Sequence, residues 1–126
     1  MYIGKLADLT GATRKAIRHY ESMGLIPSPQ RKGNYRIYTE MDVHLVKMIR
    51  RAQSVGFNLA ELNELATIKA KNGHFPIAIA NRLITEKQKQ LRQHIQEIEA
   101  IEQNLMALHE ELNLVYGEDQ FSEDAA

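Results

Sequence analysis

The chain has 126 residues, 44% of them hydrophobic, and contains neither Cys nor Trp. Without Cys, a disulfide scaffold, a thiol nucleophile and a thiolate metal site are all excluded. No apolar run approaches the roughly 18 residues of a membrane span, and residues 1–11 lack the pattern of a secretion signal, so a cytoplasmic protein without a membrane partner is expected.

The charges are distributed unevenly, although the formal net charge is zero. Residues 1–58 hold ten Lys or Arg and four Asp or Glu, whereas residues 59–126 hold six and twelve. A basic first half suits a polyanion such as DNA, and an acidic second half would face away from it. Chance clustering of charges on solvated faces is the alternative explanation.

The first 24 residues predict two short helices around a tight turn. Apolar residues from Ile3 to Leu9 recur as on one face of an amphipathic helix. Thr13 is suited to cap a second helix over residues 14–23, and Gly24 is suited to end it. The second helix would bury Ala16, Ile17 and Tyr20. Its opposite face is basic, with Arg14, Lys15, Arg18 and His19. Together the two helices form a helix-turn-helix pattern.

A small hairpin, or wing, is predicted next. Prolines at positions 27 and 29 exclude a helix, and residues 35–39 alternate with a period of two, as in a strand. Gly33-Asn34 is a plausible two-residue turn. The basic residues of this hairpin are Arg31, Lys32 and Arg36.

Two further short helices follow. Thr39, with Asp42 three residues later, is expected to cap a third helix that runs to about Ser54. Asn58, with Glu61, repeats this capping pattern for a fourth helix, which Asn72-Gly73 closes. Residues 1–70 therefore read as a winged helix-turn-helix domain of four short helices and a hairpin, and residues 71–75 as a linker.

Residues 76–116 predict one long helix, roughly 58 Å long between Ile77 and Val115 at about 1.5 Å per residue. Apolar residues recur every seven positions, and a second seam three residues later is polar at Lys87 and His94. A polar helix of this length needs a partner helix, so we expect a coiled-coil homodimer. The dimerisation residues would be Ile77, Ile84, Leu91, Ile98, Ile101, Leu105, Leu108 and Leu112. Residues 117–126 read as a short acidic tail that is disordered.

The basic residues have a functional and a neutral interpretation. In the helix-turn-helix context we favour base and phosphate contacts over a merely solvated face. The Tyr20 hydroxyl is suited to a phosphate contact and its ring to burial, and the two roles are compatible because Tyr is amphipathic. Arg50 and Arg51 are as well suited to contact flanking phosphates, as a second wing, as to make no such contact. Arg36 with Tyr35 favours a phosphate anchor on the wing. The candidate DNA-binding residues are Thr13, Arg14, Lys15, Arg18, His19, Tyr20, Arg31, Lys32, Tyr35, Arg36, Arg50 and Arg51.

Several stretches, in this order and spacing, resemble the MerR family of bacterial transcriptional regulators. They are residues 3–7 (IGKLA), 10–11 (TG), 13–21 (TRKAIRHYE), 24–26 (GLI), 35–38 (YRIY) and 56–59 (GFNL). The resemblance, closest to the metal-responsive branch, implies a winged helix, an antiparallel coiled-coil dimer and a pseudo-palindromic promoter site. It also implies a mechanism in which the dimer distorts an overlong promoter spacer so that RNA polymerase can engage both promoter elements.

The chain departs from this family in three ways. The metal-responsive branch holds its ion with Cys after the long helix, where this chain has Tyr116-Gly117 and no Cys. The residues beyond Tyr116 are too few for the large ligand domain of other members. The wing has Gly-Asn where the family has Asn-Gly, and its hairpin looks one residue shorter than is usual in the family.

The effector is unknown, and a small organic compound fits better than an ion. An antiparallel pair would bring Phe75 and Ile79 of one helix near Leu114 and Tyr116 of the other, as an apolar candidate effector pocket. Simple packing of these side chains, with no effector at all, is equally compatible with the sequence.

Other classes of function have less support. An effector-independent repressor or architectural DNA-binding protein is the main alternative. No catalytic motif or phosphate-binding loop is present, so an enzyme is not expected. The five His residues are not spaced as ligands on one helix face, so neither a metal site nor a cofactor is expected.

Overall fold

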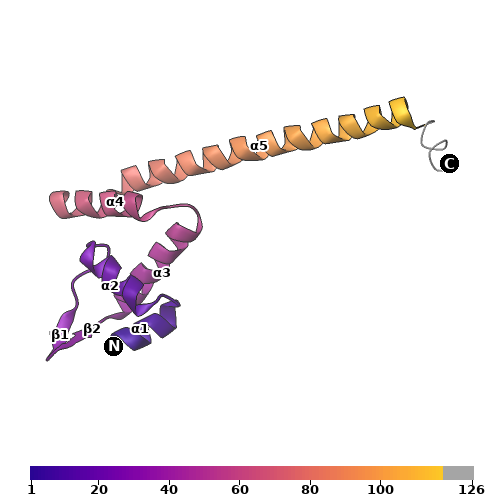
Figure 1. The fold of residues 1–126 in the computed structure, drawn as a ribbon. Helices are drawn as coiled ribbons and strands as arrows, with labels where there is room; N and C mark the ends of the chain where they lie inside the picture. The colour runs from indigo at the N-terminus through magenta and orange to yellow at the C-terminus, as the bar shows by residue number, and fades with distance from the viewer. Residues whose placement is uncertain (118–126) are drawn as a thin grey trace. The chain divides into compact units, whose positions relative to one another are not determined.

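The computed structural model describes residues 1–117, which are mainly helical, and the chain has two compact units, one over residues 1–82 and one from residue 83 on. The elements are α1 (Ile3–Thr10), α2 (Arg14–Ser22), β1 (Gln30–Lys32), β2 (Tyr35–Ile37), α3 (Glu40–Ser54), α4 (Leu59–Asn72) and α5 (Ile77–Tyr116) (Figure 1). Four short helices, a hairpin and one long helix confirm the predicted fold class. The predicted acidic tail lies, from residue 118 on, outside the described residues.

Side-chain caps start the helices where the sequence predicted them. The Thr13 hydroxyl accepts a hydrogen bond from the Ala16 N–H at 3.0 Å and opens α2. At α3, Thr39 accepts from the Asp42 N–H while the Asp42 carboxylate accepts from the Thr39 N–H at 2.8 Å. Asn58 and Glu61 make the same reciprocal pair at α4. These bonds satisfy N–H groups that have no partner inside the helix.

The hairpin β1–β2 is antiparallel and places Arg31 opposite Arg36. Gly33 opens its two-residue turn with φ of 62°, and Asn34 does not have positive φ. Positive φ at the first central residue alone is the pattern of a type II′ turn, which glycine adopts without steric cost. The Gly-Asn order therefore closes a tight hairpin.

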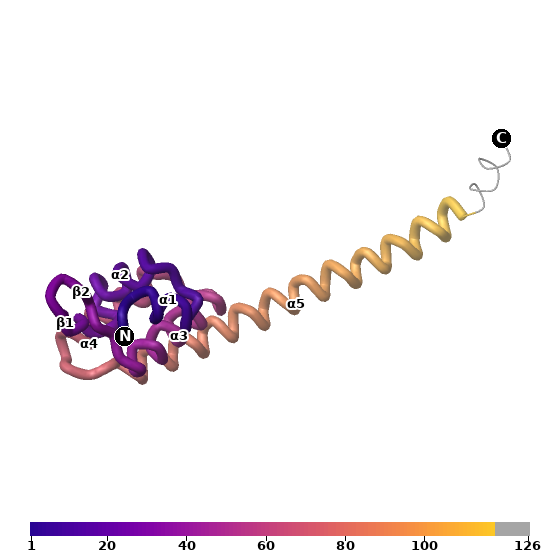
Figure 2. The backbone as a smooth tube through the Cα atoms, turned by 90° about the horizontal axis from the view of Figure 1, so that it is seen from below, coloured from indigo at the N-terminus to yellow at the C-terminus, as the bar shows by residue number. Residues whose placement is uncertain are grey.

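The core of the first unit lies between α1, α2 and α3, and α1 contacts both other helices (Figure 2). Leu6, Ile17 and Val46 are completely buried. On α1 the core side runs from Leu6 to Thr10, whose buried hydroxyl donates to the Leu6 carbonyl oxygen at 2.8 Å. Leu9 lies about 100° around the helix from Thr10 and is 48% exposed. The expectation that Leu9 belongs to the buried face was therefore wrong.

The second unit consists, in its described part, of the continuation of α5 from Leu83 to Tyr116. Most of its side chains are exposed, including the apolar ones. Within residues 1–117 no helix combines the length and the apolar character needed to cross a membrane.

Candidate nucleic-acid interface

The exposed face of α2 is basic, as predicted. Its four exposed residues in the first two turns are Arg14, Lys15, Arg18 and His19. The opposite face is anchored, because Ile17 and Tyr20 are buried in the core. An anchored helix with a free basic face can present side chains to a groove of DNA without disturbing its own packing.

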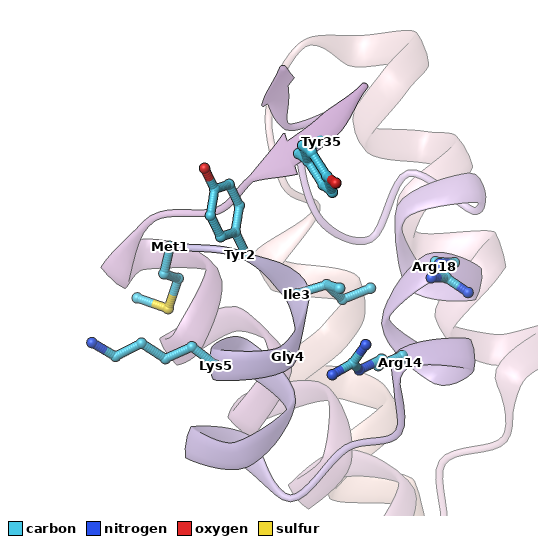
Figure 3. A pocket seen from close by; sticks show the side chains of 8 residues that line it. All are labelled: Met1, Tyr2, Ile3, Gly4, Lys5, Arg14, Arg18 and Tyr35. Carbon is cyan, nitrogen blue, oxygen red and sulfur yellow. The ribbon is translucent and has the colours of Figure 1, made fainter. Parts of the chain in front are cut away.

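A groove of about 960 Å³ lies beside this face, lined by residues from the start of α1, from α2 and from β2. Figure 3 shows Arg14 and Arg18 on α2 and Tyr35 on β2 around it. The Arg14 guanidinium lies against Gly4, where an added Cβ would be only 2.7 Å from its Nη2 atom. Two predicted cations and a predicted wing aromatic are thus brought together at one concave surface.

Several residues of this groove are not among the candidates predicted from the sequence, and two of them are Lys5 and Tyr2. Lys5 adds a third cation, and the ring of Tyr2 lies 5.7 Å from that of Tyr35, tilted by 50°. Both rings are mostly exposed. The sequence carried a signal for Lys5, since it stands in the IGKLA stretch, whereas only the fold reveals that Tyr2 lies beside the wing.

The wing presents two exposed cations, Arg31 and Lys32, on β1. Arg36 on β2 is different, because its Nε donates to Glu21 Oε1 at 3.2 Å. The other carboxylate oxygen of Glu21 accepts from the Tyr38 hydroxyl at 3.1 Å. Burial, together with the neighbouring Glu21 carboxylate, raises the pKa of Tyr38 to about 12, so this hydroxyl keeps its proton at neutral pH.

Tyr20 is part of the core. Its side chain is 4% exposed, and its hydroxyl donates to Gln53 Oε1 on α3 at 2.7 Å. Burial is the main reason that the pKa of Tyr20 is raised, and nearby Arg50 acts in the opposite direction. Of the two roles the sequence left open for Tyr20, the structure supports burial of the ring and gives the hydroxyl a partner within the protein.

A second basic surface surrounds the C-terminal half of α3. A cleft of about 370 Å³ is lined by Thr10, Lys47, Arg50, Arg51 and Ser54. Arg50 Nη1 donates to the Thr10 carbonyl oxygen at 2.6 Å, at the C-terminal end of α1, where a cation is favourable. Arg50 therefore has a structural contact in addition to its predicted DNA role, and Arg51 and Lys47 are exposed beside it.

The predicted dimerisation residues all lie on α5 and are exposed in the single chain. The exposed fractions of Leu91, Ile98 and Leu105 are 58%, 51% and 60%. The remaining members are exposed by 45% or more: Ile77, Ile84, Ile101, Leu108 and Leu112. Burying a contiguous row of such residues is favourable only against another apolar surface.

The candidate effector residues are divided between the two units of the chain. Phe75 and Ile79 belong to the first unit, and Leu114 and Tyr116 to the second. Phe75, Leu114 and Tyr116 are exposed, and Ile79 is half-buried. Over residues 1–117, no three His, Asp or Glu side chains gather as a set of metal ligands.

Comparison with known proteins supports the DNA-binding assignment. Family models described as "MerR HTH family regulatory protein" and "MerR, DNA binding" match residues 1–67 and 43–108. The transcriptional regulator CueR of Escherichia coli O6:H1 is 38% identical over 109 residues, which cover 86% of this chain and 80% of CueR.

Two solved structures share the fold and about a third of the sequence. The transcription regulator PbrR691 of Ralstonia metallidurans CH34, in complex with lead(II), has a TM-score of 0.61 and 31% identity, covering 86% of this chain and 85% of its own. MerR of Bacillus megaterium MB1, in complex with mercury(II), has a TM-score of 0.59 and 32% identity, covering 87% and 85%. The matched family models, the identity to CueR and the basic helix-turn-helix surface lead to one conclusion: the chain belongs to the MerR family of DNA-binding transcriptional regulators.

Proposed function

We propose that this regulator binds a pseudo-palindromic promoter site as a homodimer in the bacterial cytoplasm. The observation that carries the proposal is the groove between α1, α2 and the wing, which is lined by Lys5, Arg14 and Arg18. Cations at a concave surface beside an exposed helix suit the phosphates and base edges of duplex DNA.

In this proposal α2 enters the major groove and the wing follows the sugar–phosphate backbone. Arg14, Lys15 and Arg18 are within reach of base edges, where an Arg pairs with guanine in a bidentate manner. Arg31 and Lys32 on β1 contact phosphates, and Arg51 with Lys47 reaches phosphates further along the duplex. These roles rest on exposure and charge.

The dimer in this proposal forms through α5. In an antiparallel coiled coil each residue of one heptad seam faces a residue of the other seam on the partner. Centring the pair gives Leu91 a position opposite the partner's Ile101, and Ile84 a position opposite the partner's Leu108. All of these side chains are exposed in the single chain. The two α2 helices would then read half-sites one helical turn, or a multiple of it, apart.

Control of transcription would occur through DNA distortion, so that RNA polymerase engages a promoter whose spacer is too long. Bending a short duplex costs on the order of 1–6 kcal/mol, and an effector would have to supply a coupling free energy of similar size. Two relatives are complexes with lead(II) and mercury(II). This chain has no Cys to supply thiolate ligands, which favours a different effector.

We place the candidate effector site where the two ends of the α5 pair meet. Phe75 and Ile79 of one chain, with Leu114 and Tyr116 of the other, would line it and favour a small organic molecule over an ion. An effector-independent repressor is the alternative. Adding candidate molecules to a promoter-bound dimer separates the two, because only an effector changes transcription without changing promoter occupancy.

Selection of duplexes from a random pool with the purified protein tests the DNA-binding proposal. We expect a recovered sequence with two inverted half-sites and an affinity that falls steeply as salt rises from about 50 to 200 mM. A binding affinity that is flat over this range would contradict the phosphate contacts, and a selected site without inverted repeats would contradict the dimer.

A further inference from the structure

One carboxylate joins the recognition helix to the wing. Glu21 lies on α2, and its side chain is only 13% exposed. Its Oε1 accepts from Arg36 Nε on β2, and its Oε2 accepts from the hydroxyl of Tyr38, directly after β2. Tyr38 itself is 1% exposed. One oxygen of Glu21 is therefore bonded to strand β2 of the wing, and the other to the residue that directly follows this strand.

The same carboxylate lies among cations of the interface. The charges of Arg36 and Arg18 lower the pKa of the Tyr38 hydroxyl, whereas the charge of Glu21 raises it. Arg18 lines the groove and is exposed, whereas the Arg36 side chain is 32% exposed and paired. Within this basic surface, Glu21 supplies a negative charge directly opposite one of the arginines.

We propose that Glu21 is a positioning residue that determines the specificity of DNA binding. By pairing with Arg36 it keeps this arginine from making an additional phosphate contact, and by bonding to Arg36 and Tyr38 it fixes the wing relative to α2. This inference rests on the proposed DNA interface.

Glu21 can affect specificity because phosphate contacts and base contacts contribute to binding in different ways. A phosphate contact strengthens binding to every sequence and makes it more salt-dependent. Base readout depends on the exact placement of α2, which the wing restrains through the backbone contacts it makes. Loss of the Glu21 charge thus adds sequence-independent attraction and relaxes the restraint on placement, and both changes reduce discrimination between sequences.

The test compares Glu21→Gln with the wild-type protein on two duplexes, the site selected from a random pool and a scrambled duplex of the same composition. The amide oxygen of Gln can still accept from the Tyr38 hydroxyl, so thermal unfolding should be little changed. Released Arg36 side chains should steepen the salt dependence by about 0.9 per contact, or roughly two per dimer. At about 50 mM salt, binding to the scrambled duplex should tighten roughly tenfold, with a smaller gain or a loss at the selected site.

Two controls separate this role from a general effect of charge. Glu64→Gln removes the same charge from an exposed position on α4 and should leave both affinities unchanged. In an Arg36→Ala background, Glu21→Gln should no longer steepen the salt dependence, because the coupled partner is missing. Glu21→Asp keeps the charge but shortens the side chain, so it should lower discrimination with little change in salt dependence.

The outcomes are distinct. If Glu21→Gln weakens binding to both duplexes without steepening the salt dependence, Glu21 is merely structural and the inference is wrong. If Glu21→Gln steepens the salt dependence equally in the Arg36→Ala background, the inference is also wrong. A wild-type protein that binds neither duplex in a salt-dependent manner would instead contradict the proposed interface itself.

Discussion

The two units of the chain differ in how far their apolar side chains are buried. The unit of residues 1–82 completely buries Leu6, Ile17 and Val46, whereas on α5 beyond it Leu91 and Leu105 remain 58% and 60% exposed. The hydrophobic effect acts on both sets alike. The first unit therefore has a hydrophobic core of its own, whereas the described part of the helix from residue 83 carries apolar side chains that remain exposed.

The two units also differ in charge. The cations of the candidate interface belong to the first unit, and the Glu-rich part of α5 belongs to the second. One unit therefore offers a surface for a polyanion, and the other an apolar seam flanked by charge. Four experiments test this division of roles.

The largest effect is expected at the α5 seam. Leu91→Ala should weaken the dimer by about 2–5 kcal/mol for each buried site, and a symmetric dimer has two such sites. Sedimentation velocity over a range of protein concentrations measures the loss. Met106→Ala is the matched control, because Met106 is equally exposed but lies beside the seam. If the intact wild-type protein is a monomer at micromolar concentration, the second unit does not serve as the dimerisation element and the division of roles between the two units is wrong.

A core substitution in the first unit should act on folding rather than on assembly. Ile17→Ala removes a completely buried side chain from the inner face of α2 and should lower the free energy of unfolding by about 2–5 kcal/mol. Urea unfolding at a fixed protein concentration measures it, because dimer stability depends on concentration. A loss well under 1 kcal/mol would mean that α2 is not held by this core.

Arginines of the interface should divide into two kinds. Arg18→Ala on α2 should lose about 1–3 kcal/mol and relax the preference at one base pair in each half-site. Arg31→Ala on the wing should weaken all sequences alike and lower the salt dependence by about one per contact. Binding titrations on single-base variants of the selected site distinguish them. Equal losses of specificity in both variants would mean that the wing reads bases.

No effect is expected from thiophilic ions. Copper, silver and mercury salts titrated into the purified dimer on its promoter should change neither its occupancy nor the promoter geometry. Thiolates are the soft ligands that select such ions, and the sequence has none. A stoichiometric response at submicromolar ion would contradict this expectation and would direct attention to the His and Met residues.

Features that depend on neighbours in the sequence were predictable. Thr39 and Asp42, which form a reciprocal pair, are three positions apart, and the Gly33-Asn34 turn consists of two residues, so the chemistry of both is visible in the sequence itself. The alternation of buried and basic positions on α2 was visible for the same reason, because a helix repeats every 3.6 residues.

Features that depend on tertiary contact were not predictable. Glu21 meets Arg36 across 15 positions, and Arg50 meets the Thr10 carbonyl oxygen across 40. Nothing in a periodic pattern distinguishes an Arg that bonds within the protein from one that is free for DNA. For this reason the sequence analysis counted Arg36 and Arg50, like Arg18, among the candidate DNA-binding residues, although of these three only Arg36 and Arg50 bond to acceptors elsewhere in the protein among the bonds described for residues 1–117.

The anchoring of α2 has a consequence for engineering. Its cap at Thr13 and its buried residues Ile17 and Tyr20 lie apart from the exposed positions 14, 15, 18 and 19. A library that varies only these four positions would change the chemistry offered to base edges while leaving the capping bond and the buried face in place. Substitutions at these four positions of α2, with Glu21 kept constant, are thus a suitable way to direct this regulator to new promoters.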